Sequence, residues 1–377
     1  MKIPITKPVF DKEEEKSVIE TLRSGWVAQG PKVAEFESLV AGYTGSDYAV
    51  ATTSATTALF LSLHLLEIGP GDEVVVPSFS FIATANVVVH AGAKPVFVDI
   101  DPRTYNINPT EIEKLITKRT KAIIPVDQVG LPCDFSAIHK IAQKHKLHVI
   151  QDAACSLGSV YKGKRTGSYG EIACFSFHPR KAITTGEGGM ILTNNKKWAD
   201  KLKILRHHGM SVSDVARHKS SKVIREEYNI AGYNFRMSDI QAAVGVAQMK
   251  KLPKILKKRE QLANRYSKVF GKSKYIIPPF VPQGYIHNWQ SYVIRLSNNA
   301  KITRDELMQK LLNDGIATRI GVMAAHLESV YKKMLGKISL PNTQEATRET
   351  MVIPLYFQMT KEEQDYVIEK VLLHTDV

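Results

Sequence analysis

Two side chains of opposite charge, Asp152 and Lys181, are the best candidates for chemistry in this sequence. Asp152 follows the apolar run Leu147 to Ile150, and Lys181 follows another run that ends at Phe177. Ligands of open α/β sheets bind at the carboxyl ends of strands, so we expect both side chains at one site. A carboxylate there can pair with the cationic ring nitrogen of a cofactor, and a desolvated lysine can act as a nucleophile. From these residues alone, a loop acid and a solvated surface lysine remain alternatives.

Three further segments carry groups that could bind anions. Small hydroxylated residues in Thr52 to Leu59 (TTSATTAL) lead into an apolar helical run, and a helix N-terminus suits a phosphate. A plain helix cap explains the same residues without a ligand. Ser176 alternates to the same side as His178 and could reach a phosphate, whereas Asn234 and Arg236 precede a second predicted helix and could bind anions or only pack as a loop.

The elements that must position these groups alternate between strand and helix. Short runs rich in β-branched residues are separated by stretches with helical periodicity, and this rhythm predicts an α/β fold with a mostly parallel sheet and helices on both faces. The predicted strands are Asp72 to Pro77, Lys94 to Ile100, Lys121 to Asp127, Leu147 to Ala153, Ile172 to Phe177 and Met190 to Thr193. The predicted helices are Ala58 to Leu65, which precedes these strands, and Phe81 to Ala91, Asn108 to Thr117 and Asp134 to Lys146, which lie between them.

The C-terminal third has a different pattern. A long helix is predicted from Ser238 to about Phe270, followed by a proline-containing linker from Lys274 to Gly284. The rest alternates a strand (Gln290 to Leu296) with helices (Thr303 to Asp314 and Lys361 to Leu372). We therefore expect a large domain over residues 1–250 and a smaller α+β domain over residues 251–377.

Composition narrows the class of protein. The net charge of +14 favours anionic ligands, but the basic residues are dispersed and no nucleic-acid-binding motif accompanies them, so we expect no nucleic-acid partner. No apolar run approaches the roughly 18 residues of a membrane-spanning helix, and the first residues resemble no targeting signal. Three widely spaced cysteines favour neither disulfides nor a metal site, which suggests the cytoplasm.

Six motifs, taken in order, carry a resemblance to a known family. The sequence contains GPKVAEFE, TTSATTAL, PSFSFIATAN, QDAACSLGS, FSFHPRKAITTGEGG and GYNFRMSDIQAA. Together they resemble the DegT/DnrJ/EryC1/StrS family of sugar aminotransferases over nearly the whole chain. The resemblance implies fold type I of the pyridoxal-phosphate enzymes, with a mostly parallel seven-stranded sheet in the large domain. It also implies pyridoxal 5'-phosphate as cofactor and a homodimer with active sites at the subunit interface.

The resemblance also assigns roles to residues of this chain. Lys181 matches the lysine that binds the cofactor covalently and moves protons, and Asp152 matches the acid at the pyridine nitrogen. Groups at the phosphate are matched by Ala55, Thr56, Ser176 and, from the other subunit, Asn234. Phe81 matches the aromatic residue on the cofactor ring, and Cys155 stands where the family commonly has a glutamine near the ring hydroxyl. His326 resembles a histidine that lines the sugar site. We also expect Glu187, in the loop after the lysine, and Arg236 to contact the substrate.

The resemblance implies transfer of an amino group from glutamate or another amino acid to a nucleotide-linked keto sugar. TTGEGG resembles members that aminate sugar carbon 4, whereas carbon 3 members look more like GDGG. A cyclitol aminotransferase of the scyllo-inosose type is an alternative. Related sugar dehydratases carry histidine in place of the lysine, so Lys181 argues against that activity. A regulatory or nucleic-acid-binding protein is a remote alternative that rests on the positive charge alone.

Overall fold

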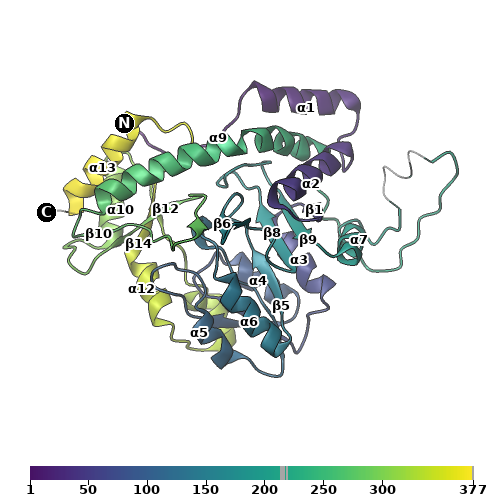
Figure 1. Ribbon diagram of the computed structural model, residues 1–377, viewed down its shortest axis with the longest axis horizontal. Coiled ribbons are helices and arrows are strands. Elements are labelled where there is room, and N and C mark those ends of the chain that lie inside the picture. Colours follow the sequence, from purple (N-terminus) through teal and green to yellow (C-terminus); the bar gives the residue numbers. More distant parts are fainter. Residues whose placement is uncertain (213–216, 218–219, 376–377) are drawn as a thin grey trace.

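The computed structural model of the protein describes residues 1–212, 217 and 220–375. It contains a central seven-stranded sheet, a four-stranded sheet and a small three-stranded sheet (Figure 1). The two larger sheets follow one another along the long axis of the molecule, and helix α9 (Asp239–Phe270) runs past both. Both chain ends lie at the end formed by the four-stranded sheet, where Ile3 pairs with Ile316.

The central sheet has the strand order β1-β9-β8-β5-β4-β2-β3. Neighbouring strands are parallel except at β9, which is antiparallel to both β1 and β8. The predicted mostly parallel sheet is therefore confirmed. Its strands are β1 (Tyr48–Thr52), β2 (Glu73–Pro77), β3 (Lys94–Val98), β4 (Thr120–Ile123), β5 (His148–Asp152), β8 (Ile172–Ser176) and β9 (Gly189–Thr193).

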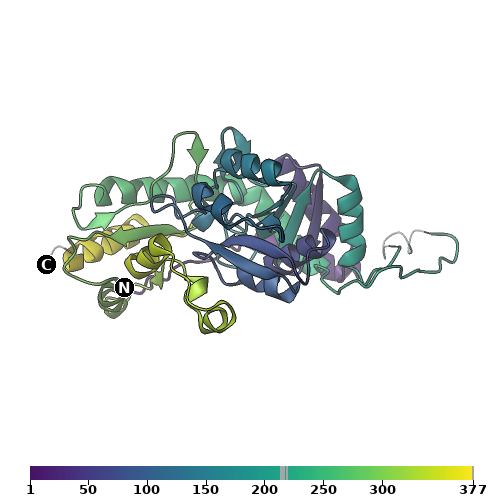
Figure 2. The ribbon, with the colours of Figure 1, turned by 90° about the horizontal axis from the view of Figure 1, so that it is seen from below.

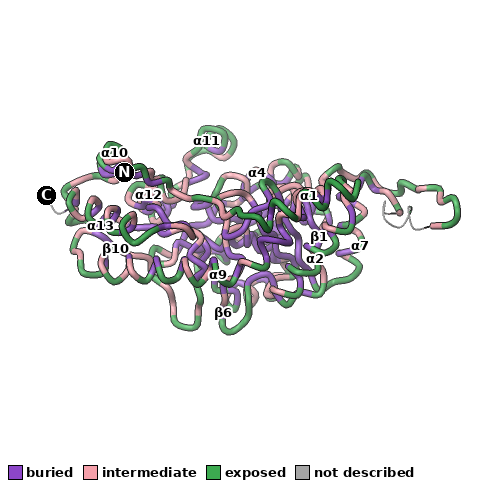
Figure 3. Tube along the Cα trace, turned by 90° about the horizontal axis from the view of Figure 1, so that it is seen from above, coloured by how far each residue is buried: buried purple, intermediate pink, exposed green. Residues whose placement is uncertain are grey.

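Helices cover both faces of this sheet, because alternate side chains of each buried strand point to opposite faces. Val74 and Val76 of β2 belong to the hydrophobic cluster under one helical layer, and Val75 to the cluster under the other. Figure 3 shows the buried residues concentrated in this part. One layer has α3 (Ala55–Leu65), α4 (Ala83–His90) and α7 (Lys196–Leu205); the other has α2 (Pro31–Thr44), α5 (Pro109–Ile112), α6 (Phe135–His145) and the first half of α9.

Helix α9 connects the two larger sheets. It begins after the cap residue Ser238, as predicted, and its 32 residues make it about 48 Å long. Its first half packs on α2 and on α1 (Lys12–Ser24), whereas Tyr266 and Phe270 near its end join the core of the four-stranded sheet. The predicted boundary between residues 250 and 251 falls inside this helix, so the division into two domains stays a prediction.

The four-stranded sheet is antiparallel and forms the C-terminal part of the molecule (Figure 2). Its order is β10 (Ile276–Ile277), β12 (Tyr292–Leu296), β14 (Thr350–Ile353) and β13 (Arg319–Ile320). The helices of this part are α10 (Arg304–Asn313), α11 (Ser329–Leu335), α12 (Pro341–Glu349) and α13 (Lys361–Thr375). The three-stranded sheet is formed by β11 (Tyr285–Ile286), β6 (Val160–Tyr161) and β7 (Lys164–Arg165).

Some predicted ranges are too long or of the wrong type. The strand predicted from Lys121 to Asp127 ends at Ile123, and Pro125, which has no amide hydrogen for a ladder, lies just beyond it. The helix predicted from Asn108 to Thr117 is one short α-helical turn followed by a 3-10 turn. The predicted irregular linker from Lys274 to Gly284 contains strand β10.

Candidate active site

Lys181 lies in a tight turn just beyond the carboxyl end of β8. Its amide donates to the carbonyl of His178 (2.9 Å), and the Arg180 amide donates to the Nδ1 of the same histidine (3.2 Å). The half-buried lysine extends toward the loop after β5, where its Nζ donates to the Sγ of Cys155 at 3.0 Å. The amine is therefore held where the carboxyl ends of β5 and β8 meet.

Asp152 is the last residue of β5, and its side chain is buried. Its Oδ2 accepts from the Thr84 hydroxyl (2.8 Å), and its Oδ1 accepts from the Ala154 amide (3.2 Å). Burial raises the pKa of Asp152, while these two hydrogen bonds and the positive charge of Lys181 lower it. Because that charge acts on the carboxyl group, the structure brings the predicted amine and the predicted acid into one site.

The predicted phosphate cradle lies at the start of α3. Ser54 caps this helix, and the amides of Ala55 and Thr56 lie in its first turn, where a helix offers them no partner of its own. Gly189 lies directly against this turn, since a Cβ at that position would be 2.3 Å from the Ser54 carbonyl group and 2.6 Å from the Ala55 nitrogen. Gly189 pairs with Ser176, so the predicted second hydroxyl belongs to the same group.

Phe81 lies at the entrance to α4 and is largely solvent-exposed, with 66% of its surface accessible. The carbonyl of Phe81 accepts a hydrogen bond from the Thr84 amide at 3.2 Å. One helical turn therefore carries an exposed aromatic ring and the buried hydroxyl that donates to Asp152. An exposed ring beside this carboxylate is open for stacking on a flat ligand.

Asn234 and Arg236 lie beside the start of α3. The Phe235 carbonyl between them accepts from the Thr53 amide (3.1 Å), one residue before the helix cap. The Arg236 Nε donates to the Asn234 Oδ1 (3.0 Å), and its Nη1 lies 3.0 Å from the His207 Nδ1. Asn234 is exposed, whereas Arg236 is half-buried.

Glu187 is an exposed residue in the largely buried loop between β8 and β9. Its side chain is free to face solvent, but its carbonyl accepts from the Thr185 hydroxyl (2.8 Å) and from the Gln241 side chain (2.9 Å). The second bond ties this loop to the first turn of α9. The carboxylate is therefore presented on a braced loop, two residues before Gly189.

His326 is in the 3-10 turn η3 (Ala325–Leu327) and is only 2% exposed. Its Nδ1 lies 2.6 Å from the Ser78 hydroxyl, which also accepts from the His326 amide (3.0 Å). The Ser78 oxygen has a second lone pair as well as a proton, so which of the two groups donates to the other depends on the tautomer of the imidazole ring. Among the described residues, Nε2 has no partner. The predicted substrate histidine thus lies below the surface, where burial lowers its pKa.

Positive charge gathers around the lysine. Burial is the main cause that lowers the pKa of His178, and the charges of Arg180, Lys181 and Arg319 lower it further, whereas Glu187 raises it. Burial lowers the pKa of Arg180, and the charge of Arg319 lowers it further. Arg319 is in β13, so the C-terminal sheet adds a cation to the turn that carries the lysine. This environment favours an anionic ligand.

Three polar residues that the sequence did not single out complete the site. Thr84 and Ser80 lie behind Asp152, and Asp127 follows β4 at the same edge of the sheet. Asp127 is fully buried and accepts from Ser156 (2.5 Å), Gln151 (2.7 Å) and the amide of Cys133 (3.0 Å). Burial raises the pKa of Asp127 to about 7. Its place at the end of a predicted strand is a signal of the same kind as that of Asp152.

These groups fit a cofactor with a carbonyl carbon, a cationic ring nitrogen and a phosphate. In the described part of the chain, the buried Asp152 has no Lys, Arg or His nitrogen within 4.0 Å, so a bound cation would satisfy it. The amine of Lys181 lies nearby, and Gly189 leaves the first turn of α3 open at close range. Lys181 and Asp152 would hold the carbonyl carbon and the ring nitrogen, and the start of α3 with Ser176 would hold the phosphate.

Two features are absent from residues 1–212, 217 and 220–375. No helix there has the length and apolar character to cross a membrane. No group of three His, Cys, Asp or Glu side chains there could hold a metal ion.

Known proteins resemble this chain in sequence and in fold. The family model described as the DegT/DnrJ/EryC1/StrS aminotransferase family matches residues 8–372. The spore coat polysaccharide biosynthesis protein SpsC of Bacillus subtilis is 40% identical over 373 residues, covering 98% of this chain and 96% of SpsC. The sugar aminotransferase Spr1654 of Streptococcus pneumoniae in its PMP form has a TM-score of 0.94 at 31% identity, with 99% of each chain covered. PseC of Helicobacter pylori, an aminotransferase of pseudoaminic acid biosynthesis, has a TM-score of 0.93 at 29% identity, with both chains fully covered.

The mostly parallel sheet, with a lysine and a buried carboxylate at its carboxyl edge, defines a pyridoxal-phosphate enzyme of fold type I. The chain belongs to the DegT/DnrJ/EryC1/StrS aminotransferase family, as the ordered motifs predict. It is a pyridoxal-phosphate-dependent sugar aminotransferase.

Proposed function

We propose that this sugar aminotransferase moves an amino group from glutamate, or another amino acid, to a nucleotide-linked 4-keto sugar. The proposal that the sugar is nucleotide-linked rests on two arginines beside the lysine, Arg180 and Arg319. Neither guanidinium has a carboxylate within 4.0 Å in the described part of the chain, and each exerts its charge on His178. Unpaired arginines from two parts of the fold are suited to a diphosphate.

The side chains divide the work as follows. When bound, the cofactor withdraws electrons from the carbon that gains or loses the amino group. Lys181 would bind the cofactor, and its amine, set free once the amino donor has taken its place, would move the proton in each half of the reaction. Asp152 holds the ring nitrogen cationic, and Cys155 lies against the lysine amine as part of the site wall.

The remaining predicted residues position the two ligands. We propose that the amides of Ala55 and Thr56 and the Ser176 hydroxyl bind the phosphate, and that Phe81 stacks on the ring. Sugar contacts are assigned to Glu187, Arg236 and His326. The buried Nε2 of His326 supports its part, because a buried polar nitrogen without a hydrogen-bond partner costs about 1–3 kcal/mol until a ligand or water pairs with it.

The preference for a 4-keto sugar rests on the loop sequence TTGEGG. SpsC, a protein of polysaccharide biosynthesis, is a relative over almost the whole chain, which supports a sugar that enters a polysaccharide. The three free cysteines, two of them buried, are compatible with the cytoplasm, where nucleotide-linked sugars would meet the enzyme.

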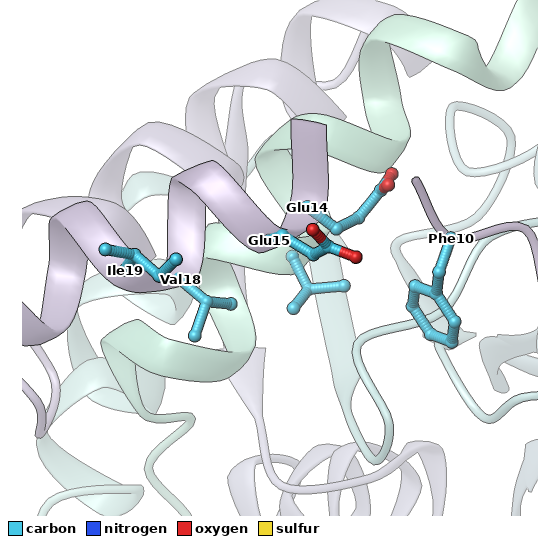
Figure 4. Close-up of a pocket in the computed structure, with 6 residues that line it drawn as sticks. Phe10, Glu14, Glu15, Val18 and Ile19 are labelled. Atoms are coloured by element: carbon cyan, nitrogen blue, oxygen red, sulfur yellow. The ribbon is translucent and has the colours of Figure 1, made fainter. Parts of the chain in front are cut away.

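We also propose a homodimer in which Asn234 reaches the phosphate of the other subunit. Apolar side chains on α1 and just before it are exposed: Phe10 (54%), Ile19 (46%) and Leu22 (52%). A surface hollow between α1 and α9 is lined by Phe10, Glu14, Glu15, Val18, Ile19 and Val244 (Figure 4). Apolar surface gathered in this way is typical of a protein interface.

The dimer is tested by mixing two inactive variants, Lys181→Ala and Asn234→Ala. If Asn234 acts across the interface, a mixed dimer has one site with both original residues, and activity returns after subunit exchange. Activity that stays absent although sedimentation shows mixed dimers would refute the shared site. A monomer in sedimentation would refute the dimer itself.

The substrate is tested with enzyme loaded with pyridoxamine phosphate. We expect nucleotide-linked 4-keto sugars to convert the bound cofactor to the aldehyde form, seen as a new long-wavelength absorbance band, whereas 3-keto sugars and scyllo-inosose do not. Arg180→Ala and Arg319→Ala should raise the KM for the nucleotide-linked sugar. Conversion by scyllo-inosose alone would establish the cyclitol activity instead. Absence of a cofactor absorbance band in the wild-type enzyme would contradict the roles given to Lys181 and the other cofactor-binding residues.

A further inference from the structure

We infer that Thr84, itself held by Ser80, is a positioning residue that aims the Asp152 carboxylate at the cofactor ring and favours its charged form. This inference rests on the role proposed for Asp152. Thr84 lies in the first turn of α4, and 68 positions separate it from Asp152 along the chain.

The direction of the hydrogen bonds follows from their geometry. The Thr84 Oγ1 lies 2.8 Å from the Asp152 Oδ2 and 2.8 Å from the Ser80 Oγ. A carboxylate can only accept, so the single hydroxyl proton of Thr84 points to Asp152. Thr84 must then accept from Ser80. The result is a chain of two donors directed at one carboxylate oxygen, and such chains strengthen each bond.

The chain is shielded from water. Ser80 and Thr84 are each 2% exposed, and Asp152 is 5% exposed. Water therefore offers little to replace the hydroxyl of Thr84, and an ionised carboxylate without it would lose its nearest donor. The other donor, the Ala154 amide, is longer, at 3.2 Å, and serves the opposite oxygen. Thr84 is thus the stronger of the two contacts that fix the carboxylate.

The groups that act on Asp152 oppose one another. Burial favours the neutral acid, and it is the largest effect on the pKa of Asp152, which it raises. The hydrogen bond from Thr84 is the largest effect that lowers this pKa, ahead of the Ala154 amide and the charge of Lys181. Other titratable groups near Asp152 are Asp127 after β4 and the buried thiols of Cys133 and Cys174. None of these three brings a positive charge.

The local fold explains why the hydroxyl is at this position. The Thr84 amide donates to the Phe81 carbonyl, so one turn sets both the exposed ring and the buried hydroxyl. A ring that lies on Phe81 then has Asp152 held within reach by Thr84. A change at Thr84 should therefore alter the bond to the ring nitrogen and leave stacking intact.

The test measures the affinity of cofactor-free protein for pyridoxal 5'-phosphate over a range of pH in two variants. Thr84→Val removes the hydroxyl at nearly constant volume, and Thr84→Ser retains it. Hydrogen bonds to charged groups predict about tenfold to a hundredfold weaker binding for Thr84→Val and near-normal binding for Thr84→Ser. On acidification the affinity of Thr84→Val should fall at a higher pH than that of wild type, because its carboxyl group takes up a proton sooner.

A purely structural role would not shift the pH dependence, and an analogue with carbon in place of the ring nitrogen adds a second readout. With this analogue, wild type and Thr84→Val should bind alike. Thr375→Val, which removes another buried hydroxyl far away in α13, is the matched control and should bind as wild type does. If Thr84→Val does not fold, Ser80→Ala takes its place, with a smaller loss of affinity and a shift in the same direction.

The outcomes separate the inference from the function on which it rests. Unchanged affinity and pH dependence in Thr84→Val, in an enzyme whose wild type binds the cofactor through Lys181, would overturn the inference alone. An equal loss with the analogue would also overturn it, since the ring nitrogen would then play no part. Wild-type protein that binds no cofactor at all would refute the proposed roles of Lys181 and Asp152 as well.

Discussion

Replacement of Gly189 by alanine should damage the predicted phosphate cradle at the start of α3. The added Cβ would lie 2.3 Å from the carbonyl carbon and oxygen of Ser54 and 2.6 Å from the Ala55 nitrogen. These are backbone atoms, so no flexible side chain can move aside. Either β9 or the first turn of α3 must retreat by roughly 1 Å to regain van der Waals separation.

Overpacking of this kind costs about 1–3 kcal/mol of unfolding free energy. The same shift opens the turn that offers the Ala55 and Thr56 amides, so we also expect weaker binding of pyridoxal 5'-phosphate to Gly189→Ala. Urea unfolding of the cofactor-free protein gives the first quantity, and cofactor titration gives the second. Gly42→Ala is the control, because its Cβ meets nothing within 4 Å and alanine is favoured over glycine in α2 by up to about 1 kcal/mol.

The reasoning would be refuted if Gly189→Ala were as stable as wild type and bound the cofactor equally well. A loss of stability without a loss of affinity would show that the retreat occurs in β9 and spares α3. Equal losses in Gly189→Ala and Gly42→Ala would show that the close approach of Gly189 to Ser54 is not the cause.

Three more results are expected. Only Cys155 should react with a thiol reagent in the native protein, because Cys133 and Cys174 are fully buried, and cofactor should slow the reaction, because Cys155 lies beside Lys181. Mass spectrometry after labelling locates the modified thiol, and early labelling of either buried cysteine would contradict this prediction. The unfolding free energy should fall as the pH drops from about 6.5 toward 3, because burial lowers the pKa of His287 to about 3 and the unfolded chain takes up its proton first. Urea unfolding should show a shallower fall in His287→Phe, and an equal slope in the two proteins would exclude His287 as the cause. Asp239→Ala should lower the unfolding free energy by about 2–4 kcal/mol in the same assay, since the Asp239 carboxylate caps α2 by accepting from the amides of Gly30, Lys32 and Val33. Asp239→Asn should restore part of this loss, and unchanged stability in both variants would rule out a capping role for Asp239.

Much of the sheet could be predicted because its strands are apolar runs of β-branched residues. Val74, Val75 and Val76 are all fully buried, which is the pattern of a strand covered on both faces. The ends of such runs predict that Asp152 and Lys181 lie at the same edge of the sheet. The direction of a strand is harder to predict than its position, because a sequence such as Met190 to Thr193 fits a parallel and an antiparallel strand equally well.

Other parts of the site carry no local signal. Thr84 lies inside a helical segment among Ala83 and Ala85, and only its contact with Asp152, far along the chain, shows what it does. The burial of His326 depends on Ser78 and Phe97 from distant segments, and small neighbours in its own segment give no hint of it. Long-range partners of this kind are set by tertiary packing, and periodicity cannot predict them.

The reversed direction of β9 explains how the site is assembled at one edge of the sheet. The parallel strands β1, β5 and β8 end at this edge, and an antiparallel β9 begins there. Gly189, its first residue, therefore lies opposite Thr52 at the end of β1 and opposite Ser176 at the end of β8. A parallel β9 would bring its last residue, Thr193, to this edge, and any side chain there would collide with the first turn of α3. In the site proposed above, the glycines that follow Lys181 thus serve the phosphate end, while the lysine serves the other end.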